Sequence, residues 1–452
     1  MIAYYFPPES GSGSLRPLFF ANHLADSGDD VHVFTAKVED YLYDQTQDAD
    51  LVEQIHPKVK ITHCSVFRPR EALFKLRKMF SFRATVLASK NSHATFSSNS
   101  IKPTIYQRFK DIIIDLLATP DRHAGWIFDC LRRVKIEINK RRPDIIYTTG
   151  GPWSSLISGV LLKIISRVPV ILDFRDPWIS NPVEKQRSPL TRSINKHLEK
   201  FVVQYADGIV ANTEGLRNDF ISRYPRLNPN QIITITNGFE EYLPISDTTE
   251  KHPFTIVYTG SLYSTRNPLQ LIKAINGLIN NRLIHPSDLK LKIVGGEIDI
   301  TNNEIAEMLS LKPLQKIIEI IPRVPYKLVP DFLRNADILL LIQPDFPLQI
   351  PRKVYEYISA RKPILCISER DSSTGALIRD YNLGIVCENT VVEIENAIKK
   401  IFLSWENGDL SSSVSNNYDN FKNSELTYRL RTFIDVIIKN KYNVPKTYSP
   451  GI

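Results

Sequence analysis

Residues 254–275 read FTIVYTGSLYSTRNPLQLIKAI, a β-branched and apolar run that ends at Gly260 and leads into a helical pattern. A short run of this kind is typical of a parallel strand that is buried on both faces. The chain opens on the same design, because the apolar residues 3–6 run into a loop with Gly11 and Gly13 and then into a helical pattern. Glycine lets the backbone approach a ligand, and a helix N-terminus attracts anions. Each stretch therefore predicts a turn that binds phosphate or a polar sugar, with an ordinary tight turn as the alternative.

Similar runs alternate with helical patterns along the chain and form two series. The first series covers residues 30–35, 58–66, 144–150, 168–174, 208–213 and 232–238, and the second covers 254–260, 289–296, 317–322, 336–342, 362–368 and 383–388. Strands that alternate with helices predict parallel sheets with helices on both faces. We therefore expect an α/β protein with two doubly wound, Rossmann-like parallel-sheet domains in tandem.

The break between the two series sets the domain boundaries. We expect an N-terminal domain over residues 1–240 and a second domain over residues 254–410. Residues 241–253 are polar, bear prolines and have no periodicity, so we interpret them as a linker. Residues 411–452 are expected to form a C-terminal helix followed by a tail.

Composition excludes several classes of protein. An apolar fraction of 42% and a charged fraction of 23% are ordinary for a soluble globular chain. The four cysteines are far apart and show no CxxC spacing, which points to a reducing compartment and not to a disulfide scaffold. No signal peptide opens the sequence, and no apolar run is long enough to span a bilayer. We therefore predict a cytoplasmic protein.

The excess positive charge of +8 is concentrated in residues 66–90, which hold seven Lys or Arg and one acid. A basic amphipathic stretch can lie on an anionic membrane surface, and the alternative is a solvated helix with one face on its own domain. Its phenylalanines fit helical packing or lipid contact better than base stacking, so we expect no nucleic-acid partner.

The second series of strands carries the clearest constellation of charged residues. Arg266 stands just before a helix and close to Gly260 and Ser261, where a guanidinium can bind two phosphate oxygens; a surface arginine is the alternative. Lys353 and Glu356 share one face of a helix that begins near Pro351. We expect Lys353 to address phosphates and Glu356 to address ribose hydroxyls, against the alternative of a solvated salt bridge.

Four segments together resemble a known family, and they are YYFPPESGSGSLRP (4–17), VILDFRDPW (170–178), YTGSLYSTRNP (258–268) and PRKVYEYISARKPI (351–364). The chain resembles the retaining glycosyltransferases of family 4, which have the GT-B fold. The resemblance implies that the two domains face each other across a cleft, with residues 1–240 binding the acceptor and residues 254–410 binding the nucleotide sugar. It also implies that the C-terminal helix crosses back to the first domain. The resemblance covers about residues 1–440. TPDRHAGWI (119–127) is similar to the branch that builds bacterial surface polysaccharides.

The resemblance implies roles for residues in the second domain. Arg266 and Lys353 match the positions that grip the donor diphosphate. Glu356 matches the second Glu of the family's E-x7-E motif, which holds the ribose. Val324 falls where the family's backbone reads the base. The position of the first Glu is Leu348 in this chain, which leaves the contact with the sugar open.

In the first domain, Gly11, Ser12 and Gly13 match the loop that faces the donor phosphate and the acceptor. Asp176 falls near a His that contacts the transferring sugar in many members; a salt bridge to Arg175 or a helix cap is the alternative for Asp176. Only three residues precede Tyr4, fewer than is usual in the family, so we expect a shortened first strand.

The predicted reaction is transfer of a sugar, with retention, from a UDP- or GDP-sugar to a lipid-linked saccharide at the inner face of the membrane. It would serve surface polysaccharide, lipopolysaccharide or capsule synthesis. Asp176, Arg266 and Lys353 are the predicted catalytic residues, and we expect no metal or other cofactor because no DxD motif stands in a strand-end loop. Two alternatives stay open: a nucleotide-sugar 2-epimerase of the same fold, and a non-catalytic partner in a polysaccharide-assembly complex.

Overall fold

The computed structural model describes residues 1–41, 47–67, 115–116, 119–244, 252–260, 262, 266–295, 303–410 and 417–442. The chain divides into two compact units. The first consists of Met1–Ile179, Val183–Ile209 and Ile434–Ile452, and the second of Ser180–Pro182 and Val210–Phe433. The basic stretch predicted to contact a membrane lies, apart from Val66 and Phe67, outside the described residues.

The N-terminal half of the chain alternates helices and strands as its apolar runs predict. Its elements are α1 (Ser12–Asp26), β1 (His32–Ala36), α2 (Asp50–Glu53), β2 (Lys60–Cys64), α5 (Trp126–Lys140), β3 (Ile146–Thr149), α6 (Trp153–Ser166), β4 (Val170–Phe174), α7 (Pro189–Tyr205), β5 (Gly208–Ala211), α8 (Glu214–Arg223) and β6 (Ile232–Thr234). One sheet has the order β3-β4-β5-β6, and β1 pairs with β2. The β1–β2 and β3–β4 pairs are parallel.

The first strand differs from the prediction. Ile2 forms bridges to both Phe34 of β1 and Thr148 of β3, and the N–H of Ala3 donates to the carbonyl of Phe34 at 3.0 Å. Residues 1–4 therefore lie between β1 and β3, while the expected strand over residues 3–6 does not form. The prolines at 7 and 8 have no N–H to donate to a neighbouring strand, and the carbonyl of Phe6 accepts from the N–H of Glu9 in a turn, so the strand cannot continue beyond this point.

The C-terminal half follows the same alternation. Its elements are β7 (Phe254–Thr259), α9 (Leu269–Asn280), β8 (Leu289–Val294), α10 (Asn303–Leu309), α11 (Lys312–Ile317), β9 (Ile318–Ile321), α12 (Val329–Arg334), β10 (Ile338–Ile342), α13 (Lys353–Ser359), β11 (Ile364–Ile367), α14 (Ser373–Asp380), β12 (Gly384–Cys387), α15 (Val391–Glu406) and α16 (Asn423–Tyr442). Short 3₁₀ segments cover Val38–Asp40, Pro182–Gln186, Pro229–Gln231, Tyr326–Leu328 and Asp419–Phe421. The sheet has the order β12-β11-β10-β7-β8-β9, and its strands pair in parallel.

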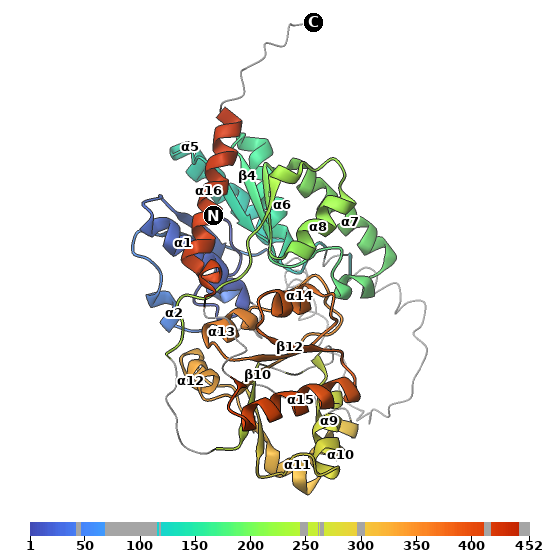
Figure 1. Cartoon of the computed structure of the whole chain (residues 1–452). Coiled ribbons are helices and arrows are strands. Elements are labelled where there is room, and N and C mark those ends of the chain that lie inside the picture. The colour runs from blue at the N-terminus through green and yellow to red at the C-terminus, as the bar shows by residue number, and fades with distance from the viewer. Residues whose placement is uncertain are drawn as a thin grey trace, which may run out of the picture. The chain divides into compact units, whose positions relative to one another are not determined.

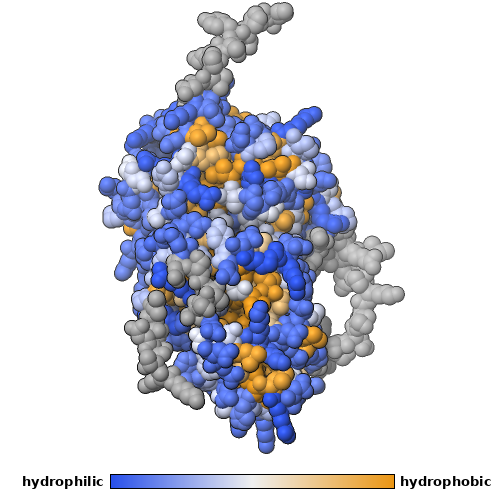
Figure 2. Space-filling model, in the orientation of Figure 1, coloured by the Kyte–Doolittle hydropathy of each residue, from blue (hydrophilic) through white to orange (hydrophobic). Residues whose placement is uncertain are grey.

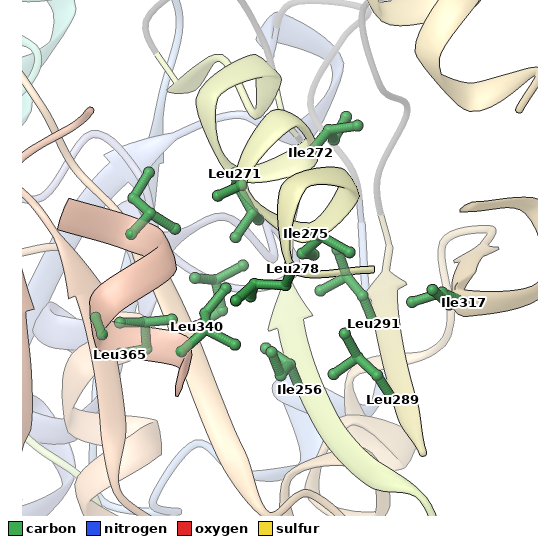
Figure 3. Close-up of a cluster of buried hydrophobic side chains, with 14 of the residues drawn as sticks. Ile256, Leu271, Ile272, Ile275, Leu278, Leu289, Leu291, Ile317, Leu340 and Leu365 are labelled. Carbon is green, nitrogen blue, oxygen red and sulfur yellow. The ribbon is translucent and has the colours of Figure 1, made fainter. Parts of the chain in front are cut away.

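Two apolar layers sandwich this sheet. Ile256 and Tyr258 of β7 pack with α9 and α15 on one face, whereas Val257 packs with α12, α13 and α14 on the other. Figure 1 shows α9 and α15 on one side of β10 and β12, with α13 and α14 on the opposite side. In Figure 3, side chains of α9 such as Leu271 and Leu278 point at the strands. Burial on both faces explains why these strands read as continuous apolar runs.

The strand order reverses between β7 and β10. The chain leaves β7 for α9 on one face and leaves β10 for α13 on the other, so the carboxyl ends of these two neighbours open away from each other. In an open parallel sheet such a switch point is where ligands bind.

The polar surface and the unpaired cysteines are as the amino-acid composition predicts. Figure 2 shows hydrophilic residues over most of the visible face, with hydrophobic patches between them. All four cysteines are buried and unpaired. Among the helices that the structure describes, none combines the length and the apolar character that crossing a membrane would require.

Candidate active site

Lys353 lies at the switch point of the second unit. It is the first residue of α13, and its Nζ donates to the carbonyl of Thr259 at the end of β7. Nζ also stands 4.1 Å from the centre of the Tyr258 ring. Burial and, second, the charge of Arg266 lower the pKa of Lys353 to about 7. A cation is therefore held where its own solvation is poor, which is typical of functional lysines.

Two adjacent strands each end at a glycine, and the first of these glycines leaves room for Lys353. Gly260 follows β7 with φ +106°, and a Cβ added there would lie 2.9 Å from Nζ of Lys353. Gly295 follows β8 with φ +81°. The predicted Gly turn is thus present, with a backbone conformation that strongly favours glycine. Ser261, also predicted to bind the donor, lies outside the described residues.

Arg266 lies at the same edge of the sheet. Its Nε and Nη2 reach Oε1 of Gln343 at 3.3 and 3.2 Å, and Gln343 is buried directly after β10. The positive charge of Arg266 is close enough to lower the pKa of Lys353. Two cations that repel each other at a ligand-binding edge form a pair suited to a polyanion.

Glu356 does not pair with Lys353, as a simple salt bridge on one helix face would require. Its Oε1 accepts from the hydroxyl of Tyr326 at 3.0 Å and lies 3.4 Å from Nη1 of Arg352. Lys353 instead points to Thr259, so Lys353 and Glu356 address separate regions. Val324 is half-buried in the segment that follows β9, two residues before Tyr326.

A buried tyrosine fixes α13 against the sheet. The hydroxyl of Tyr357 donates to the carbonyl of Leu340 at 3.1 Å and accepts from the N–H of Thr259 at 3.2 Å. Burial raises the pKa of Tyr357 well above its ordinary value, so the hydroxyl remains a donor. Leu348, where the family has a Glu, is half-buried in the loop between β10 and α13.

In the first unit, a side chain of the glycine loop itself binds to the backbone at the start of α1. Helix α1 begins at Ser12, with Gly11 as its N-cap. The N–H of Gly11 donates to Oε1 of the buried Glu9 at 2.8 Å, and burial raises the pKa of Glu9. Oε2 of Glu9 is also buried and has no hydrogen-bond partner among the described residues. One of the N–H groups that we expected to be open for a ligand therefore already donates to the carboxyl group of Glu9. The sequence prediction did not include this carboxyl group.

Arg175 joins the loops at this edge of the first unit. Its Nη1 donates to the carbonyl of Gly13 at 2.6 Å, its Nε donates to that of Gly150 at 2.7 Å, and its Nη2 donates to that of Gly151. Asp176, the predicted sugar contact, follows Arg175 immediately and is partly exposed. The guanidinium of Arg175 thus holds Gly13 to Gly150 and Gly151, and Asp176 follows at the same end of β4.

The segment TPDRHAGWI is also built into the first unit. Asp121 caps α6, because its Oδ2 accepts from the N–H of Ser154 at 2.7 Å. The buried ring of His123 makes hydrogen bonds to the hydroxyls of Tyr4 at 2.9 Å and Tyr5 at 3.3 Å. Sequence reasoning singled out neither side chain; the only signal was the resemblance of the segment itself.

Within the described part of the chain, no three His, Cys, Asp or Glu side chains gather so as to hold a metal ion.

Comparison with known proteins identifies the class of enzyme. Residues 19–238 match the Glycosyl transferase 4-like domain, and residues 243–419 match the family Glycosyl transferases group 1. The chain is a family 4-type glycosyltransferase with the GT-B fold.

Sequence relatives and solved structures are distant. The alpha-maltose-1-phosphate synthase of Mycobacterium tuberculosis (strain CDC 1551 / Oshkosh) is 26% identical over 110 residues, 24% of this glycosyltransferase and 27% of the synthase. The chain thus spans only about a quarter of the curated relatives that it matches.

Two solved structures share the fold over nearly the whole chain. A glycosyltransferase from Rickettsia africae ESF-5 has a TM-score of 0.61 and 15% identity, covering 97% of this chain and 98% of that one. Anabaena Alr3699/HepE, in complex with UDP and glucose, has a TM-score of 0.56 and 14% identity, covering 98% and 99%.

Proposed function

We propose that this glycosyltransferase moves a sugar, with retention of anomeric configuration, from a UDP- or GDP-sugar to a lipid-linked saccharide in surface-polysaccharide synthesis. The observation that carries the donor half is the half-buried Lys353, with Arg266 beside it, at the switch point of the second unit. Anabaena Alr3699/HepE, which has the same fold, binds UDP.

The donor diphosphate would lie against Arg266, Lys353 and the backbone of Gly260. Glu356 would accept from ribose hydroxyls, and the backbone near Val324 would contact the base. Breaking the anomeric C–O bond places negative charge on the leaving diphosphate, and fixed cations lower that barrier. The two side chains would supply this charge without a metal cofactor, so we expect transfer to continue in the presence of EDTA.

Retention is consistent with attack on the same face as the departing phosphate. The acceptor hydroxyl loses its proton to that phosphate, the bond from oxygen to the anomeric carbon forms, and the C–O bond to the diphosphate breaks. Asp176 would stabilise the positive charge on the sugar ring or orient one of its hydroxyls. Such a route needs no pair of carboxylates like that of glycoside hydrolases.

The acceptor half of the proposal rests on the first unit. The loop of Gly11, Ser12 and Gly13, held through Arg175, would face the acceptor. The similarity of residues 119–127 to the surface-polysaccharide branch supports a lipid-linked saccharide. The basic residues 66–90 would bring the enzyme to the anionic inner face of the cytoplasmic membrane.

The test is a comparison of Lys353→Ala and Arg266→Ala with the exposed control Lys400→Ala, in an assay of sugar transfer to lipid extracts. Each site variant should lose transfer by about 10²- to 10³-fold, the range known for removal of one such donor. Circular dichroism should stay unchanged, and the control should keep full activity. Wild-type transfer in both site variants would exclude this site, and an isomerised nucleotide sugar without transfer would favour the epimerase chemistry.

A further inference from the structure

Three side chains of the second unit form a closed triad next to the proposed ribose position. Tyr326 stands in the turn after β9, whereas Arg352 and Glu356 stand one helical turn apart at the start of α13. Nη2 of Arg352 donates to the Tyr326 hydroxyl at 3.3 Å, and this hydroxyl donates to Oε1 of Glu356 at 3.0 Å. Nη1 of Arg352 closes the triad, 3.4 Å from the same Oε1.

All of these contacts fall on one oxygen of Glu356. Within the described part of the chain, Oε2 accepts no hydrogen bond, and 18% of the side chain remains exposed. The triad therefore fixes the carboxylate and leaves one oxygen to accept from a ligand. An ionised carboxylate oxygen makes stronger hydrogen bonds than a neutral acceptor does, so it suits a ribose hydroxyl.

Tyr326 is partly exposed to solvent although its hydroxyl makes these hydrogen bonds. The residue is 42% exposed, while its hydroxyl is engaged by Glu356 and Arg352. Burial of the hydroxyl, together with the nearby charge of Glu356, raises the pKa of Tyr326 to about 12, so it stays a donor at neutral pH. The guanidinium of Arg352 lies over the ring, 5.9 Å from its centre, and the exposed part of the ring, two residues from Val324, offers a surface on which a base can stack.

We propose that Tyr326 recognises the nucleoside of the donor in two ways. Its hydroxyl positions Glu356 for the ribose, and its ring packs against the base. Tyr326 is thus a positioning residue for the ribose and a direct contact for the base, a role that rests on the proposed donor site.

The proposal predicts that the two ends of the nucleotide respond separately. Calorimetric titration of the full-length enzyme would use UDP, GDP, 2′-deoxy-UDP, 3′-deoxy-UDP and inorganic pyrophosphate. Removing the ribose hydroxyl that Glu356 holds should weaken binding to the wild type about tenfold, as expected for a hydrogen bond to a charged group. In Tyr326→Phe this loss should shrink to about twofold, whereas pyrophosphate should bind as in the wild type.

The variant Tyr326→Ala separates the ring from the hydroxyl. It should bind the ribonucleotide about tenfold more weakly than Tyr326→Phe does, because base stacking is lost as well. Tyr428→Ala, at a tyrosine that is 66% exposed on α16, is the matched control and should bind as the wild type. Thermal unfolding of each variant checks that the fold is kept.

The outcomes distinguish this inference from the proposed function. If the wild type binds UDP or GDP, but Tyr326→Phe shows the full loss on removal of the ribose hydroxyl, the positioning role of Tyr326 is wrong. If Tyr326→Ala also binds the ribonucleotide as tightly as the wild type does, the whole inference falls and the donor site stands. If the wild type binds neither nucleotide nor pyrophosphate, the donor site itself falls, and the inference falls with it.

Discussion

Lys353 carries its charge in a place where burial opposes that charge. Its pKa is lowered to about 7 by burial first and by Arg266 second. The sequence predicted the residue and its partner cation, because both stand where a helix follows a strand. It did not predict the depth of the site, because Tyr258 and Thr259, which surround Nζ, belong to a strand far away in the chain.

The pKa of Lys353 predicts how nucleotide affinity depends on pH. A bound diphosphate stabilises the ammonium, so the pKa of Lys353 is higher in the complex than in the free enzyme. Affinity should therefore be full below about pH 7 and fall as the pH rises above 7, by at most tenfold per pH unit for one proton. Titration of UDP between pH 7 and 9 measures this slope.

Lys353→Arg is the control for this pH dependence. A guanidinium keeps its charge over the whole range, so the variant should lose the slope. Ionisation of UDP itself is the same for both enzymes and cancels in the comparison. An equal slope in the wild type and in Lys353→Arg would show that Lys353 is not the titrating group.

At the scale of elements, the β-branched runs predicted where the strands lie. They did not predict which side chains from distant parts of the chain pair with each other. β7 was expected over residues 254–260 and covers Phe254–Thr259, because both of its faces are buried. Arg16 of α1 and Asp173 of β4 show the limit. They form a buried, two-bond ion pair at 2.9 and 3.0 Å, although 157 residues separate them. A charge in an apolar run marks a buried group, but its partner cannot be read from local sequence.

This ion pair predicts non-additive stability. Arg16→Met or Asp173→Asn alone leaves a buried charge or polar group without its partner and should lower the free energy of unfolding by about 3–5 kcal/mol. The double variant should lose clearly less than the sum of the two. Urea unfolding followed by tryptophan fluorescence measures this, since Trp126, Trp153 and Trp178 all lie in the first unit. Strictly additive losses would mean that the two charges do not stabilise each other.

At the scale of the whole molecule, two series of strands predicted two Rossmann-like units, and the GT-B fold confirms this. The candidate site was predicted in part. Arg266, Lys353 and Gly260 meet at one sheet edge, whereas Tyr326 was not singled out because its role depends on contact with Glu356, 30 residues later. The domain boundaries, the crossing helix and the membrane contact remain predictions.

A crystal structure of the enzyme with UDP tests the donor site most directly. We expect the diphosphate within hydrogen-bond distance of Nζ of Lys353 and the guanidinium of Arg266, with a ribose hydroxyl on Oε2 of Glu356. UDP bound elsewhere, or an empty site at saturating UDP, would contradict the assignment.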